Sequence, residues 1–191
     1  MKILTFDIET TNTFDEVGSS NPADLDLAVV CVHDSYTDQI THYFKEDLGK
    51  LWPLIEEASM LISYNGDHFD IPLLNKYYAG DLNNIKSLDL MKEVKNVIGR
   101  RVKLDDIATA TLGESKSADG LQSIIWWRQG KIDQVVSYCK QDVVVTRKVY
   151  DFAMKKGYLE YNNRGVKEKI KLDTTNWEII EENNLAPTLG F

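Results

Sequence analysis

Short apolar runs and longer segments with helical spacing alternate along the chain. Residues 2–8 form an apolar run that leads into a loop rich in Thr, Asn and Ser, which is typical of a central strand and its connection. Segments 27–32 and 39–44 flank a polar, turn-like stretch at residues 34–38. Because such a stretch favours reversal of the chain, the pattern predicts an antiparallel hairpin beside the first strand.

After this hairpin, helical and strand patterns alternate. Helical spacing predicts helices over residues 48–58, 71–78, 90–98, 104–112, 121–128 and 133–156, and apolar runs predict strands over residues 60–64 and 85–88. The resulting order, βββαβαβα, indicates an α/β fold with a mixed five-stranded sheet flanked by helices. Residues 158–161 and 167–172 match a further hairpin.

Length and composition favour one globular domain. The chain has 191 residues, of which 43% are hydrophobic and 27% charged. We expect a domain over residues 1–157 and a C-terminal extension over 158–191, with its hairpin packed on the same domain. No apolar run reaches the roughly 20 residues that a membrane span needs, and Asp7 comes too early for a secretory signal. We therefore expect a soluble, cytoplasmic protein with no membrane partner, and its two cysteines, Cys31 and Cys139, as small buried residues.

The charge distribution qualifies the acidic total. The net charge is −8, which disfavours phosphate binding when taken alone. Residues 1–90 carry 5 basic and 16 acidic side chains, whereas residues 91–191 carry 17 basic and 14 acidic ones. An acidic first half suits a site that collects divalent cations, and the basic excess of the second half suits a rim that holds a nucleic-acid strand.

Two acids follow the first apolar run. Asp7 and Glu9 are two residues apart at the end of the predicted strand, so both side chains project from the same face. Ligand sites of α/β proteins lie at the carboxyl ends of such strands, and two carboxylates there suit a metal ion. A solvated strand end is the alternative.

Two further acids lie in helices or at their ends. Asp70 follows the predicted strand at 60–64 and precedes a proline, so a helix N-cap is its strong alternative role, and Asn65 also fits a turn. Tyr138 and Asp142 are four residues apart on one helical face that continues through apolar positions. An ionised aspartate on such a face needs a compensating charge, either a metal ion or a buried salt bridge.

Together these segments resemble the three motifs of the DEDD exonuclease superfamily. They are Phe6-Asp7-Ile8-Glu9-Thr10, Asn65-x-x-x-Phe69-Asp70 and Tyr138-x-x-x-Asp142. The tyrosine four residues before the last aspartate resembles the DEDDy branch. The chain is most similar to the proofreading exonuclease domains of family-B DNA polymerases and their stand-alone relatives. The resemblance covers about residues 1–155 and implies an RNase H-like fold.

The resemblance also implies a mechanism. The expected activity is hydrolysis of single-stranded nucleic acid, DNA in preference, from its 3′ end with two divalent cations. Asp7, Glu9, Asp70 and Asp142 are then the metal ligands, and Tyr138 orients the attacking water. The other motif residues, Thr10, Asn65 and Phe69, are expected to bind the substrate. Because the ligands are hard oxygens, Mg²⁺ or Mn²⁺ is favoured over zinc.

The substrate and partners are less narrowly defined. The expected partner is a DNA or RNA 3′ end, and replication or repair proteins are further candidates. Candidate phosphate contacts are Arg100, Arg101, Lys103, Lys167, Lys169 and Lys171, for which solvated surface is an equal alternative. Trp126 and Trp127 fit base stacking or, as the better alternative, core packing. A catalytically silent relative and a metal-dependent endonuclease remain alternative functions.

Overall fold

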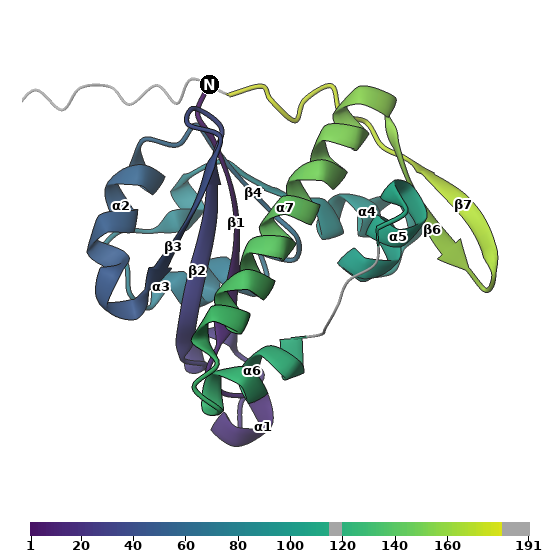
Figure 1. Ribbon diagram of the computed structural model, residues 1–191. Coiled ribbons are helices and arrows are strands. Elements are labelled where there is room, and N and C mark those ends of the chain that lie inside the picture. The colour runs from purple at the N-terminus through teal and green to yellow at the C-terminus, as the bar shows by residue number, and fades with distance from the viewer. Residues whose placement is uncertain (115–119, 181–191) are drawn as a thin grey trace, which may run out of the picture.

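A computed structural model describes residues 1–114 and 120–180, and its centre is a five-stranded sheet (Figure 1). The strands stand in the order β3-β2-β1-β4-β5. Strand β2 pairs antiparallel with β1 and β3, while β4 pairs parallel with β1 and β5. The strands span β1 Ile3–Thr10, β2 Leu27–Asp34, β3 Gln39–Phe44, β4 Met60–Ser63 and β5 Ser87–Asp89. The predicted α/β class with a mixed five-stranded sheet is confirmed.

Helices surround the sheet, and a separate hairpin follows the last of them. The helices of the described residues are α1 Phe14–Val17, α2 Leu48–Glu56, α3 Asp70–Asn75, α4 Leu90–Ile98, α5 Leu104–Leu112, α6 Gly120–Arg128 and α7 Ile132–Lys156. Short 3₁₀ turns occupy Pro22–Asp24, Lys45–Asp47 and Leu82–Asn84. The hairpin consists of β6 Tyr158–Asn163 and β7 Val166–Lys171, which form a second sheet. The remainder of the expected C-terminal extension, residues 181–191, lies outside the described residues.

The two faces of the central sheet are covered by different helices. Alternation along β1 sends Leu4, Phe6 and Ile8 into a core shared with α2 and α3. The opposite face of β2 packs against α7. Val29 of β2 and Val143 of α7 belong to a separate cluster of buried apolar side chains there. In Figure 1, α2 and α3 lie on one side of the sheet and α7 on the other. The long helix therefore passes directly over the end of β1 that carries the acids.

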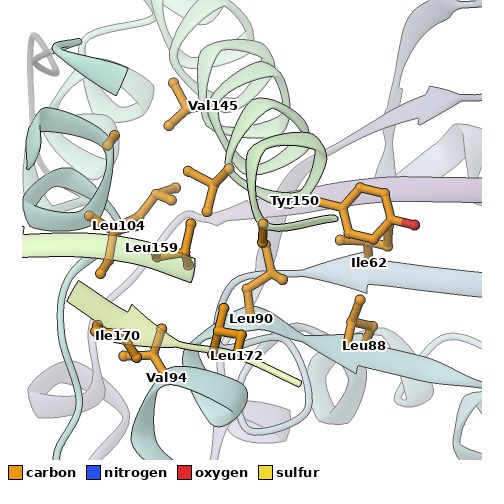
Figure 2. Close-up of a cluster of buried hydrophobic side chains, with 14 of the residues drawn as sticks. Ile62, Leu88, Leu90, Val94, Leu104, Val145, Tyr150, Leu159, Ile170 and Leu172 are labelled. Atoms are coloured by element: carbon orange, nitrogen blue, oxygen red, sulfur yellow. The ribbon is translucent and has the colours of Figure 1, made fainter. Parts of the chain in front are cut away.

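The hairpin β6–β7 shares one core with the sheet and with α4, α5 and α7. Leu159 and Ile170 are fully buried in this core, close to Leu90 and Val94 of α4 (Figure 2). Side chains of this kind each contribute roughly 1.5–3 kcal/mol on burial. Thr111 of α5 also exchanges hydrogen bonds of 2.9 and 3.0 Å with the backbone of Glu160. The hydrogen bonds fix the hairpin against α5, and the shared core packs it against the second half of α7.

Several element boundaries depart from the sequence prediction, and α3 and β5 are two examples. The helix predicted over 71–78 ends at Asn75, whose side chain accepts a hydrogen bond from the Leu82 backbone at 2.9 Å and donates one to Asp81. These polar contacts favour a turn over continued helix. The strand predicted over 85–88 lies at Ser87–Asp89, where it pairs in parallel with β4.

One short helix lies within the loop predicted after β1. Thr13 caps α1, and Glu16 accepts a hydrogen bond from the Thr13 backbone at 2.8 Å, which together form a capping box. The helix places Phe14 at the end of β1, close to the acids. Within residues 1–114 and 120–180, no helix is both long and apolar enough to cross a membrane.

Candidate active site

A cavity of about 480 Å³ lies at the carboxyl ends of β1 and β4, beside the first half of α7. Its walls come from segments that are distant in the sequence. They include all eight residues for which the motifs predict a role: Asp7, Glu9, Thr10, Asn65, Phe69, Asp70, Tyr138 and Asp142. The fold therefore brings the three motifs together at the edge of the sheet where α/β folds hold ligands.

Strand β1 presents Asp7 and Glu9 toward α7. Oxygen atoms of these two side chains and the Cys139 sulfur of α7 all lie within 4.8 Å of one another. Glu9 is buried and Asp7 is partly buried. Two carboxylates this close together, away from bulk water, favour a cation between them.

Cys139 belongs to the packing beneath this pair. Its thiol donates a hydrogen bond to the Asp7 carbonyl oxygen, with 3.3 Å between sulfur and oxygen. Burial raises the pKa of the Cys139 thiol well above its usual value, and Cys31 and Asp7 raise it further. Because a protonated thiol is a poor ligand for a hard cation, Cys139 supports the strand instead of a metal ion. Both cysteines are free and buried, as the sequence predicts.

Asp89 holds the loop that carries the second motif. Asn65 in this loop has φ of 73°, a left-handed conformation that asparagine tolerates better than most residues. The Asp89 carboxylate accepts hydrogen bonds from the backbone N–H groups of Asn65 at 2.8 Å and Asp67 at 3.3 Å. It also caps α4 by accepting from the Met91 N–H at 3.0 Å. A single buried side chain therefore joins the loop to α4.

Gly66 allows the same loop to turn tightly. A Cβ atom at this position would lie 2.2 Å from the Ser63 hydroxyl oxygen and 2.5 Å from the Ser63 Cβ. Ser63 is fully buried, so it has no room to move aside. A side chain at residue 66 would displace the loop and with it Asp70.

Asp70 is the first residue of α3 and points into the cavity without capping the helix. The N-cap is Phe69, and no side chain makes a capping hydrogen bond there. Asp70 is only 4% exposed, and burial, together with the charges of Asp89 and Asp142, raises its pKa to about 8. Backbone hydrogen bonds at Asp70 itself and Ile8 oppose this rise. The capping role that competed for Asp70 is therefore not observed.

The first half of α7 supplies Tyr138 and Asp142, which are each 6% exposed. Burial raises the pKa of Tyr138, and the charges of Asp142, Glu9, Asp7 and Asp105 raise it further. The phenol hydroxyl therefore keeps its proton across the physiological range. These effects also show that three of the motif acids, Asp7, Glu9 and Asp142, lie within electrostatic reach of one hydroxyl group.

Aromatic and ionic contacts hold the elements around Tyr138. Trp126 of α6 packs edge-on against the Tyr138 ring, with 6.2 Å between ring centroids. Arg128 of the same helix pairs with Glu16 of α1 at 2.6 Å, which joins two walls of the cavity. Arg147, one of the cations nearest to Asp142 in the sequence, pairs with Asp151 at 2.9 Å.

The remaining candidates divide between the cavity and other surfaces. Both tryptophans are partly buried in the cluster between β2 and α7, which agrees with core packing as the better alternative. Lys103 lines the cavity. In contrast, Lys167 pairs with Glu160 at 2.9 Å on the hairpin, and the Lys169 amine lies 3.9 Å above the Tyr158 ring.

The donor set of the cavity fits divalent metal ions. Four carboxylates line one partly closed space, and the charge of Asp142 makes ionisation of Asp70 less favourable. A divalent cation removes this conflict, and carboxylate oxygens are the ligands that Mg²⁺ and Mn²⁺ prefer.

Sequence reasoning gave no role to two residues that shape this site. Asp89 lies between the strand predicted over 85–88 and the helix predicted over 90–98, where an aspartate is a recognisable N-cap signal. Asp105 lies close enough to Tyr138 to raise its pKa, and no local pattern marks it.

Comparison with known proteins defines the class to which this fold and site belong. The chain belongs to the RNase H superfamily, whose family model matches residues 4–154. Among solved structures, it is similar to the family B DNA polymerase of the hyperthermophilic archaeon Pyrobaculum calidifontis, with a TM-score of 0.62 and 16% sequence identity. The similarity covers 81% of this chain and 24% of the polymerase chain, so the protein spans about a quarter of that length. At this identity the likeness establishes a shared fold. A search of curated proteins finds no match.

Proposed function

We propose that the protein is a metal-dependent 3′–5′ exonuclease that acts on single-stranded nucleic acid, with DNA as the favoured substrate. The observation that carries this proposal is the convergence of four carboxylates and Tyr138, from three separate motifs, on one cavity. Membership in the RNase H superfamily supports a nuclease that processes nucleic acid. The tyrosine in the third motif supports the DEDDy branch.

The chain's own residues divide the work between binding and orientation. Asp7, Glu9, Asp70 and Asp142 are the proposed ligands of two Mg²⁺ or Mn²⁺ ions. When bound, such ions supply a hydroxide at neutral pH and stabilise the charge on the departing oxygen. The Tyr138 hydroxyl, which like that of any tyrosine is protonated at neutral pH, hydrogen-bonds the attacking water and fixes its direction.

The cavity walls suit an unpaired terminal nucleotide. Phe14 and Phe69 pack edge to face, with centroids 6.0 Å apart, and both line the cavity together with Leu121. Such apolar and aromatic surfaces stack on bases without regard to sequence. Thr10 and Asn65 supply polar groups beside them, and these two residues with Phe69 are the proposed substrate contacts.

Cleavage of labelled linear and circular single strands tests this function. We expect wild-type protein with Mg²⁺ to shorten only the linear strand, stepwise from its 3′ end, and expect no cleavage with chelator or with the Asp7→Ala variant. Equal cutting of circles would instead identify an endonuclease. No cutting of either strand by wild-type protein would favour a silent nucleic-acid-binding relative. Matched DNA and RNA strands in the same assay test the preference for DNA.

A further inference from the structure

A second hollow, of about 280 Å³, adjoins the candidate active site. The two share Asn65, so the loop of the second motif forms the wall between them. We call this second space the basic hollow, and the residues that line it are Asn65, Asp67, His68, Asp89, Met91, Lys92, Lys95 and Arg101. Its cations come from α4 and from the segment before α5.

The charges of the basic hollow leave a local positive excess. Asp67 pairs with Lys92 at 2.8 Å, which offsets both charges. The Asp89 carboxylate is buried and accepts hydrogen bonds from the backbone. Lys95 and Arg101 are exposed, and neither forms an ion pair with any residue in the described part of the chain. With three cations against Asp67 and Asp89, the hollow has a formal charge of +1, and in a chain of net charge −8 such a local positive excess suits an anionic ligand.

The segment before α5 connects the basic hollow to the active-site cavity. Val102 is buried, and its carbonyl oxygen accepts a hydrogen bond of 2.8 Å from the Tyr64 hydroxyl. This bond fixes the segment beside the second-motif loop. Arg101, on one side of Val102, lines the basic hollow, and Lys103, on the other side, lines the cavity. Exposed cations therefore follow one rim, from Lys103 through Arg101 to Lys95.

We propose that the basic hollow binds the backbone phosphates of the nucleic-acid strand on the 5′ side of the nucleotide being removed. The inference rests on the proposed function, because it takes the 3′ end to occupy the active-site cavity. A strand that leaves this cavity past Asn65 meets Lys103, Arg101 and Lys95 in turn. Contacts to phosphates do not depend on base sequence, so the rim binds a single strand of any sequence. A longer strand reaches more of these cations, so its affinity is higher.

Binding of strands of two lengths tests the rim separately from catalysis. Fluorescence anisotropy in EDTA, without cleavage, measures the affinity for 5′-labelled oligothymidylates of three and twelve nucleotides. The double variant Lys95→Gln/Arg101→Gln should bind the twelve-nucleotide strand about tenfold more weakly at low salt, and its salt dependence should fall by about 1.4 in log–log slope. Binding of the three-nucleotide strand should be unchanged. The matched control Lys155→Gln/Lys156→Gln removes two exposed cations from the last turn of α7 and should bind both strands as wild type does.

Each outcome has a definite meaning. Unchanged binding of the long strand by the Lys95→Gln/Arg101→Gln variant, or an equal loss in the Lys155→Gln/Lys156→Gln control, overturns the proposed rim. If the rim variant alone loses affinity while wild-type protein cleaves nothing in Mg²⁺, the rim stands and the exonuclease proposal fails. If wild-type protein cleaves linear strands and the rim variant binds normally, the exonuclease proposal stands and the rim fails. Thermal unfolding of each variant checks that the fold is retained.

Discussion

The two halves of α7 bury different kinds of side chain on the same helical face. The first half brings Tyr138 and Asp142 into the active-site cavity. The second half places Val145 and Val149 in the apolar core that it shares with the hairpin, as Figure 2 shows for Val145. The polar residues are as inaccessible to water as the apolar ones, since Asp142 is 6% and Val145 4% exposed.

The apolar second half of α7 helps to hold the buried carboxylate of the first half in place. Burial of a carboxylate such as that of Asp142 costs free energy unless charges or hydrogen bonds compensate it, whereas burial of Val149 contributes to stability outright. One rigid helix joins the two, so the apolar half fixes the position of the polar half. Stability and catalysis should therefore respond to substitutions at opposite ends of α7.

The largest expected effect is the loss of activity in Asp142→Asn. This change keeps the shape of the side chain and removes the charge that the proposed metal site needs. Several kcal/mol of transition-state stabilisation correspond to a loss of about 10³-fold or more in Mg²⁺-dependent cleavage. The melting temperature in EDTA should not fall, because the remaining carboxylates repel one another less. Activity near the wild-type level would remove Asp142 from the proposed ligand set.

A smaller loss is expected for Tyr138→Phe, which keeps the ring and removes only the hydroxyl. The ring still packs against Trp126, so the fold should be unchanged. If the hydroxyl directs the attacking water, kcat should fall about 10- to 100-fold while KM changes little. Steady-state kinetics on a labelled linear strand measure both constants. Equal kinetics for the two proteins would leave Tyr138 as a core residue only.

Val149→Ala tests the apolar second half of α7. Val149 is fully buried, and loss of two methyl groups in a packed core should lower the free energy of unfolding by about 2 kcal/mol. Cleavage per folded molecule should remain normal well below the melting temperature. Urea denaturation and initial rates measure the two quantities. Lys156→Gln, an exposed change on the same helix, serves as the matched control for stability.

Sequence reasoning was most accurate where local signals define an element. Helices α4 and α5 have the predicted bounds, because each is followed by a glycine, Gly99 or Gly113, with φ of 75° or 73°. That conformation ends a helix and favours glycine, so the signal is legible in the sequence. The end of α3 at Asn75 was missed because it depends on contacts with residues several positions further along the chain.

The same distinction between local signals and tertiary contacts applies to the candidate site. Motif order was sufficient to select Asp7, Asp70 and Asp142, which line one cavity. Asp89 was not selected, because its role depends on β5 lying beside β4 and so bringing a helix cap against the second-motif loop. Lys95 was likewise indistinguishable from any exposed lysine until the fold placed it beside Arg101. Short-range patterns identify the acids that could bind a metal ion. The residues that hold these acids in place are recognised only in the tertiary structure.

The most gradual expected effect concerns Asp70, a second buried carboxylate that lines the same cavity. Its pKa of about 8, above the ordinary 3.8, means that the folded protein retains a proton there that the unfolded chain has lost between these pH values. Burial and the facing charges of Asp89 and Asp142 cause this shift. Stability of the metal-free protein should therefore decrease as pH rises from about 4 to about 8, by on the order of 1 kcal/mol per pH unit from this group.

Asp70→Asn isolates this contribution, because an amide stays neutral in both states. Urea denaturation of wild type and variant in EDTA, at several pH values, gives the difference in free energy of unfolding. That difference should shift in favour of the variant as pH rises, and added Mg²⁺ should reverse the trend if Asp70 helps to hold a cation. A pH-independent difference would show that Asp70 is ionised in the folded, metal-free protein. The cavity would then tolerate its charges without a metal ion, and the contrast between the two halves of α7 would lose its physical basis.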